Sequence, residues 1–108
     1  MIKFKYNDKE FMLDFDRASV EFLERSGFSL TEYTGHIATM QPILFRGSFI
    51  KNHKFERNLD YNKMWDSIKN KKKFQEALLD MVAETYQSLM GGNEENEDNE
   101  GNENWEVI

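Results

Sequence analysis

Cysteine is absent from this chain of 108 residues, proline occurs once, and no long apolar run is present. Without cysteine the chain can form neither a disulfide nor a thiolate metal site, and we expect it in a reducing compartment. No stretch approaches the roughly 18 apolar residues of a transmembrane helix, and residues 1–5 alternate polar with apolar side chains, unlike a signal peptide. These absences predict a soluble protein that is not exported and does not enter a membrane.

Motifs that carry catalysis or bind metals are also missing. The two histidines, His36 and His53, are 17 positions apart and belong to no His-Glu-x-x-His pattern. No glycine-rich loop of a phosphate-binding type occurs, and no serine stands in a nucleophile elbow. The sequence therefore predicts no catalytic residue, no metal and no cofactor, and the protein is not expected to be an enzyme.

Charge is distributed unevenly along the chain. Seven of the 20 acidic residues lie in residues 91–108, which contain no lysine or arginine. Residues 46–73 instead hold nine basic residues against three acidic ones. Within it, the stretch Lys69-Asn-Lys71-Lys72-Lys73 is flanked by Trp65 and Phe74, and basic clusters interleaved with aromatic residues can bind nucleic acid. A solvated charged loop is the commoner meaning of such a run. We keep nucleic-acid binding as the weaker interpretation.

Residues 2–15 predict a β-hairpin. Apolar and polar side chains alternate on both sides of Asn7-Asp8, two residues that tolerate the positive φ of a tight turn. A two-residue turn here determines which residues face each other across the strands. The expected pairs are Tyr6 with Lys9, Lys5 with Glu10, Phe4 with Phe11 and Ile2 with Leu13.

Capping residues and apolar periodicity predict four or five helices after the hairpin. The expected elements are a helix capped by Asp16 and stopped by Gly27, a short turn or helix opened by a Ser29–Glu32 capping box, a helix from Thr39 with Pro42 in its first turn, a helix capped by Asp60, and a last helix from Phe74 to Leu89. The fold class is thus α+β and mostly α, in a single domain of residues 1–90.

Residues 91–108 have a different composition. Gly, Asn, Glu and Asp dominate, and no apolar residue precedes Trp105, so we expect a disordered acidic tail. Trp105 is followed by Glu-Val-Ile, which has the form of a short binding motif on a tether, unless these residues fold back onto the domain. The tether interpretation predicts that deletion of residues 92–108 leaves the thermal midpoint of unfolding nearly unchanged.

Three features together resemble a known family. They are the hairpin with its following helix, which ends at Gly27-Phe28, the segment Thr39-Met-Gln-Pro-Ile-Leu-Phe-Arg-Gly-Ser-Phe49, and the last amphipathic helix with its acidic tail and Asn-Trp-Glu terminus. The chain is similar in these features to the small tail assembly chaperones of long-tailed bacteriophages of Gram-positive hosts and their prophages. In that family the middle segment forms a Thr-Met-x-Pro helix with a small residue before a phenylalanine.

The resemblance implies a non-enzymatic role in the cytoplasm of the bacterial host. Proteins of this family bind the tape measure protein, keep it soluble and help tail tube protein polymerise around it, and they are absent from the mature virion. Many are also made in a longer form by ribosomal frameshifting, in which case this chain would be the short form.

Side chains that could contact such a partner are aromatic residues and methionine, which adapt their packing to different apolar surfaces. Met40, Phe45 and Phe49 lie on a similar stripe of the expected third helix, and Trp105 is the fourth candidate. The same stripe is also compatible with an ordinary core. We further expect homo-oligomers, formed through the hairpin or the 40–50 helix.

Two other functions fit the sequence less well. One is a small regulatory protein that binds nucleic acid through residues 46–73, with the acidic tail imitating phosphate charge. The other is an adaptor that presents the Trp105 motif to another protein.

Overall fold

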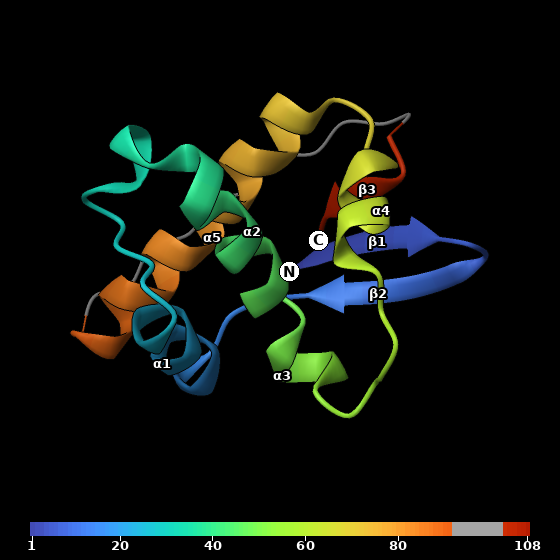
Figure 1. Cartoon of the computed structure of the whole chain (residues 1–108). Helices are drawn as coiled ribbons and strands as arrows, with labels where there is room; N and C mark the ends of the chain where they lie inside the picture. The colour runs from blue at the N-terminus through green and yellow to red at the C-terminus, as the bar shows by residue number, and fades with distance from the viewer. Residues whose placement is uncertain (92–102) are drawn as a thin grey trace.

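The computed structural model describes residues 1–91 and 103–108 (Figure 1). The elements in chain order are β1 Ile2–Tyr6, β2 Lys9–Leu13, α1 Arg17–Arg25, a 3-10 turn η1 Tyr33–Gly35, α2 Ile37–Gly47, α3 Ile50–His53, α4 Tyr61–Asp66, α5 Lys71–Leu89 and β3 Trp105–Val107. The predicted class is confirmed, because an N-terminal hairpin is followed by helices that make up most of the regular structure. Within the described ranges, none of the helices has the length and apolar character that a membrane span requires.

The hairpin forms with the predicted register. Asn7 and Asp8 have φ angles of 52° and 64°, the left-handed values that a two-residue type I′ turn requires. Phe4 faces Phe11 and Ile2 faces Leu13, and all four side chains are buried. The turn and the alternation of side chains therefore lead to the same pairing.

Three of the predicted helix boundaries are confirmed by their capping contacts. The carboxylate of Asp16 accepts a hydrogen bond from the backbone N–H of Ser19 at 2.9 Å and opens α1. The carboxylate of Asp60 accepts one from the backbone N–H of Lys63 at 3.2 Å and opens α4. Gly91 follows α5 with a φ of 94°, the left-handed conformation common after a helix end.

The middle of the chain differs from the prediction at both ends of α2. The helix starts at Ile37, so Pro42 lies in its interior and cannot donate a hydrogen bond to the carbonyl of Ala38. The helix ends at Gly47. Phe49 precedes the separate helix α3, which begins at Ile50. Ser48 lies at this bend, where its carbonyl accepts a hydrogen bond from the backbone N–H of Asp14 at 2.9 Å. A contact with the hairpin thus determines where α2 stops.

The predicted Ser29–Glu32 capping box does not form. The Ser29 hydroxyl lies 3.1 Å from that of Thr31, and the segment is a turn that leads into η1. Tyr33 of η1 is buried, and its hydroxyl pairs with the Gln75 amide of α5. A tertiary contact therefore holds this segment in place of a local cap.

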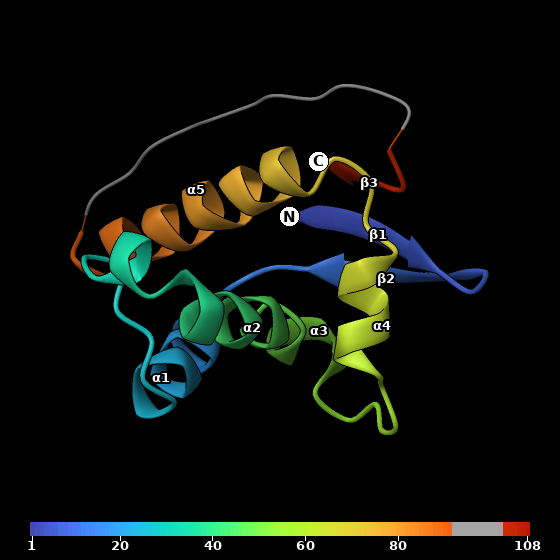
Figure 2. The same ribbon diagram turned by 45° about the horizontal axis from the view of Figure 1, so that its top comes forward.

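The core is aromatic and is centred on Phe45 of α2. Its ring packs against Phe4 of β1 at 6.2 Å between centroids, Trp65 of α4 at 5.3 Å and Phe74 of α5 at 5.9 Å. Figure 2 shows α2 lying between α1 and α4, with α5 above these helices in that view. One side chain therefore joins the sheet to two further helices.

Helices α1 and α2 cross closely at Gly47. A Cβ atom at this position would lie 2.5 Å from Cδ2 of Leu23. That distance is shorter than any normal carbon contact, so a larger residue at position 47 would require the buried Leu23 side chain or one of the helices to shift. The small residue before Phe49 in the sequence thus has a packing role.

The last residues correct the prediction of a disordered tail. Trp105–Val107 forms β3, which pairs antiparallel with β1 and gives the sheet order β2-β1-β3. Trp105 faces Phe4, is 5% exposed and packs on Phe74 at 5.3 Å. Burial of this ring outweighs the entropy of ordering a short strand. The domain therefore comprises residues 103–108 as well as 1–91, and residues 92–102 lie outside the described part of the chain.

Because Trp105 belongs to the core, removing it should destabilise the fold. We expect Trp105→Ala to lower the free energy of unfolding by about 3–5 kcal/mol, the usual cost of truncating a buried large aromatic side chain. Chemical denaturation followed by circular dichroism measures the change. Glu106→Ala, at the neighbouring exposed position, is the control and should change the free energy by less than about 0.5 kcal/mol. Equal stability of Trp105→Ala and the parent chain would restore the tether interpretation.

Candidate functional site

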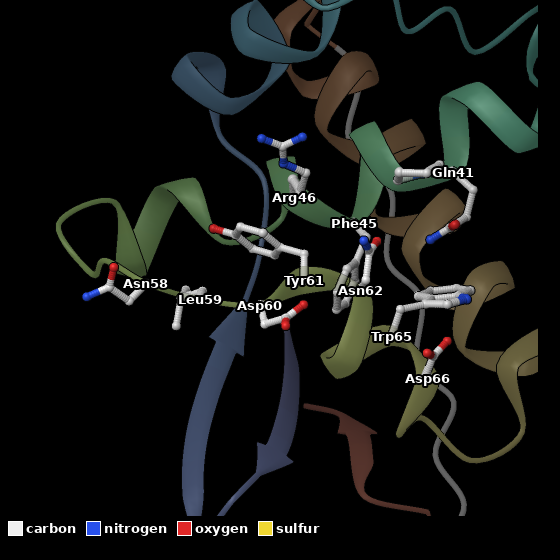
Figure 3. Close-up of a pocket in the computed structure, with 11 residues that line it drawn as sticks. Gln41, Phe45, Arg46, Asn58, Leu59, Asp60, Tyr61, Asn62, Trp65 and Asp66 are labelled. Carbon is white, nitrogen blue, oxygen red and sulfur yellow. The ribbon is translucent and has the colours of Figure 1, made fainter.

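A groove of about 740 Å³ opens between α2, α4 and the loop before α4 (Figure 3). Its volume lies within the range of about 300–1,000 Å³ that is typical of ligand pockets. Its apolar lining consists of Pro42, Phe45, Leu59, Tyr61 and Trp65. Its polar lining consists of Gln41, Arg46, Asn58, Asp60, Asn62 and Asp66.

Aromatic contacts hold the wall that α4 contributes. Trp65 packs edge-on against Phe45 and also against Phe74, at 5.8 Å. Tyr61 lies one helical turn before Trp65, and the Arg46 guanidinium lies 5.5 Å from the centre of its ring. Burial raises the pKa of the Tyr61 phenol, an effect that Arg46 partly opposes, so the phenol stays neutral at physiological pH. The groove therefore has a preformed aromatic wall.

Gln41 supplies a hydrogen-bond donor that the described part of the chain leaves unused. Its Nε2 atom is buried and has no partner there. Figure 3 shows the Gln41 side chain extending from α2 toward Trp65. A buried amide without a partner costs about 1–3 kcal/mol, so an acceptor that enters the groove would recover part of this free energy. A peptide carbonyl or a side-chain amide is such an acceptor.

The four predicted contact residues are not available on the surface. Met40 is 6% exposed, Phe45 and Phe49 are each 1% exposed, and Trp105 is 5% exposed. All four therefore belong to the core of this structure, and a direct contact of any of them with a partner stays a prediction. Only Phe45 reaches the groove, as one of its lining residues.

The groove residues that sequence reasoning missed are Gln41, Tyr61 and Trp65. Tyr61 and Trp65 fall in the helix predicted after Asp60, and Trp65 enters the sequence prediction only as a flank of the basic stretch. Their spacing of four residues places both rings on one helix face, which was the available signal. Nothing local distinguishes this pair from core aromatics, because the distinction depends on the position of α2 opposite α4.

Several of the nine cations in residues 46–73 make contacts within the protein. Lys51 pairs with Asp14 at 3.0 Å, and Arg46 lies over Tyr61. Lys71 donates hydrogen bonds to the carbonyls of Asp66 and Ile68. Nucleic-acid binding through this segment stays an alternative prediction. The adaptor interpretation loses its basis because Trp105 is buried.

No group of three or more His, Asp or Glu side chains in residues 1–91 and 103–108 is arranged to hold a metal ion. His53 instead has a structural contact with the sheet. Its Nε2 accepts a hydrogen bond from the backbone N–H of Met12 at 2.9 Å. This bond assigns the ring proton to Nδ1, which pairs with the Glu56 carboxylate. Hydrogen bonds from Lys9 and His53 hold the pKa of Glu56 below its usual range.

Side chains of α3 cover the outer edge of β2. The Asn52 amide donates to the Met12 carbonyl at 3.0 Å, and His53 accepts from the Met12 N–H. On the other side of the hairpin, β3 pairs with β1. The hairpin edges through which we predicted self-association are therefore occupied at these positions, and the apolar residues of α2 are mostly buried. Self-association itself stays a prediction.

Comparison with known proteins places the whole chain in one family. The family is described as a domain of unknown function (DUF5055), and its model matches residues 1–108, so the chain belongs to it. No curated protein and no solved structure matches the chain. The family description specifies no activity.

Removing the Asn52 and His53 side chains tests whether they protect the edge of β2 from pairing with another chain. In the double variant Asn52→Ala/His53→Ala the N–H and carbonyl of Met12 lose their partners, and the strand edge becomes able to pair with another chain. We expect larger species than the parent forms, increasing with concentration, in size-exclusion chromatography with light scattering. The control Lys54→Ala/Arg57→Ala changes two exposed residues nearby and should behave like the parent. A double variant that keeps the parent's size at every concentration would show that the contacts do not protect the edge.

Proposed function

We propose that this DUF5055 protein is a non-enzymatic assembly chaperone for phage tails. In this proposal it binds the tape measure protein in the groove between α2 and α4 and assists the assembly of tail tube protein around it. It acts in the cytoplasm of the bacterial host and is not part of the mature virion. The observation that carries the proposal is the open groove with its aromatic wall.

The lining of the groove favours binding over catalysis. It contains no serine, threonine, histidine or lysine, and Asp60, one of its two carboxylates, is engaged in capping α4. It combines rings that are held by the core with amides that can exchange hydrogen bonds with a peptide. Apolar walls with a few polar groups are typical of sites that receive side chains of a partner protein.

A helix with an apolar stripe fits this site. Side chains three or four residues apart on such a helix project together and can enter one groove. Arg46 lies at one side of the groove and Asp60 and Asp66 at another (Figure 3). A client segment whose apolar stripe is flanked by charges of both signs would complement this rim. The tape measure protein, which the family resemblance describes as long and helical, would provide many such segments.

Blocking the groove tests the proposal. Asn62 is exposed on α4 and lines the groove, so Asn62→Trp should fill it without disturbing the core. The variant would be produced together with the tape measure protein of the same genome, and the complex recovered by affinity purification. We expect at least about a tenfold loss of complex, equivalent to about 1.4 kcal/mol of binding free energy, and a matching loss of soluble client.

The matched control is Gln87→Trp, which adds the same ring at an exposed amide position of α5 outside the groove. It should bind the client like the parent chain. Thermal unfolding of both variants establishes that they are folded. Full binding by folded Asn62→Trp would exclude the groove as the client site, and absence of binding by the parent chain would overturn the chaperone proposal.

A further inference from the structure

We propose that residues 103–108 form an exchangeable strand. In this view, the site that they fill on their own copy is also the site at which the same segment of a second copy binds. Reciprocal exchange would join two copies without any new interface. The inference starts from the contacts of β3 and from the length of chain that leads to it.

The backbone of β1 provides one wall of the site. The N–H of Lys5 donates to the Asn104 carbonyl at 2.8 Å, and the N–H of Ile108 donates to the Met1 carbonyl at 2.8 Å. Between these bonds Lys3 faces Glu106, and Nζ of Lys3 lies 3.7 Å from Oε2 of Glu106. Such backbone pairing accepts an extended segment of either the same chain or another one.

Side-chain contacts make the site specific for Asn-Trp. The Asn104 amide donates to the Lys5 carbonyl at 3.2 Å and accepts from the N–H of Lys69 at 3.3 Å. The Trp105 indole N–H donates to the Lys69 carbonyl at 3.1 Å, and its ring packs on Phe74. These contacts recognise both polar groups of the Asn104 amide and the single donor of the indole.

All of these contacts join residues 103–108 to partners between Met1 and Phe74. The partners belong to β1, to the loop before α5 and to the first turn of α5, which are elements of the main body. The same bonds would form if the strand came from a second copy, which is the condition for domain swapping. The balance between the closed and the exchanged form therefore depends on the connection to β3.

That connection consists of the 11 residues 92–102, which include two glycines and no proline. It leads from the end of α5 to β3. The residue before β3 contacts the loop that precedes α5, so β3 lies near the start of this helix. Figure 2 shows the end of α5 and β3 at opposite ends of the helix. A helix of 19 residues is about 28 Å long. A chain of this length spans at most about 40 Å when it is fully extended.

Pairing within one copy thus requires the connection to bridge a large part of its maximum reach, which lowers the effective concentration of the strand at its own site. Short flexible linkers give effective concentrations of order mM, so we expect the closed form at micromolar concentration and exchange as the concentration approaches about 1 mM. Copies that bind side by side along one client would reach such local concentrations. This last step rests on the proposed function, whereas the exchange itself does not.

The absence of cysteine allows a direct test. Lys3 and Glu106 face each other at the exposed side of β1 and β3, and directly opposed residues of this kind have Cα atoms about 5.5 Å apart, within disulfide range. The variant Lys3→Cys/Glu106→Cys would be equilibrated at concentrations from about 10 μM to about 1 mM and then oxidised. Non-reducing electrophoresis separates chains closed on themselves from covalent dimers.

Exchange predicts that the dimer share rises roughly in proportion to concentration while monomer dominates. The control Lys5→Cys/Glu10→Cys joins β1 to β2 across the two-residue turn and should close only within a chain at every concentration. A mixture of the single variants Lys3→Cys and Glu106→Cys should form the mixed disulfide in preference to either symmetric one. Monomeric disulfide alone up to about 1 mM, or no preference in the mixture, would overturn the inference. No client is present, so the outcome is independent of the groove experiment.

Discussion

The packing of Phe45 is the interaction on which the rest of the structure depends. Its ring lies 5.1–6.3 Å from five others, contributed by β1, α4, α5 and the bend after α2. Each such aromatic pair contributes about 0.5–1.5 kcal/mol beyond the area that it buries. Because these rings come from distant parts of the chain, they hold together elements that are too short to be stable alone.

The same packing also shapes the groove. Trp65 contacts Phe45 and Phe74 in the core and lines the groove on its other side. A wall supported by the core does not have to be ordered when a partner binds, which reduces the entropic cost of association. Stability and the proposed binding surface are therefore linked, and variants at exposed lining residues separate the two better than variants at the rings.

The two edges of the small sheet are covered in different ways, and this difference bears on self-association. At the β2 edge, Asn52 and His53 of α3 bond both backbone groups of Met12, which blocks pairing with another chain there. At the β1 edge, the covering element is β3, a strand attached through the 11 residues 92–102. One edge is thus closed by the body of the domain, and the other by a segment that a second copy could also supply.

The sequence by itself determined the elements whose signals are local. The Asn7-Asp8 turn and side-chain alternation gave the hairpin register, and Asp16 and Asp60 marked helix starts, because these interactions span only a few residues. Tertiary structure decided the interior place of Pro42, the bend at Ser48 and the burial of Trp105. The last two depend on a partner distant in sequence, which is Asp14 for Ser48 and Phe74 for Trp105. The groove belongs to this second group, since composition cannot show that α2 and α4 lie opposite each other.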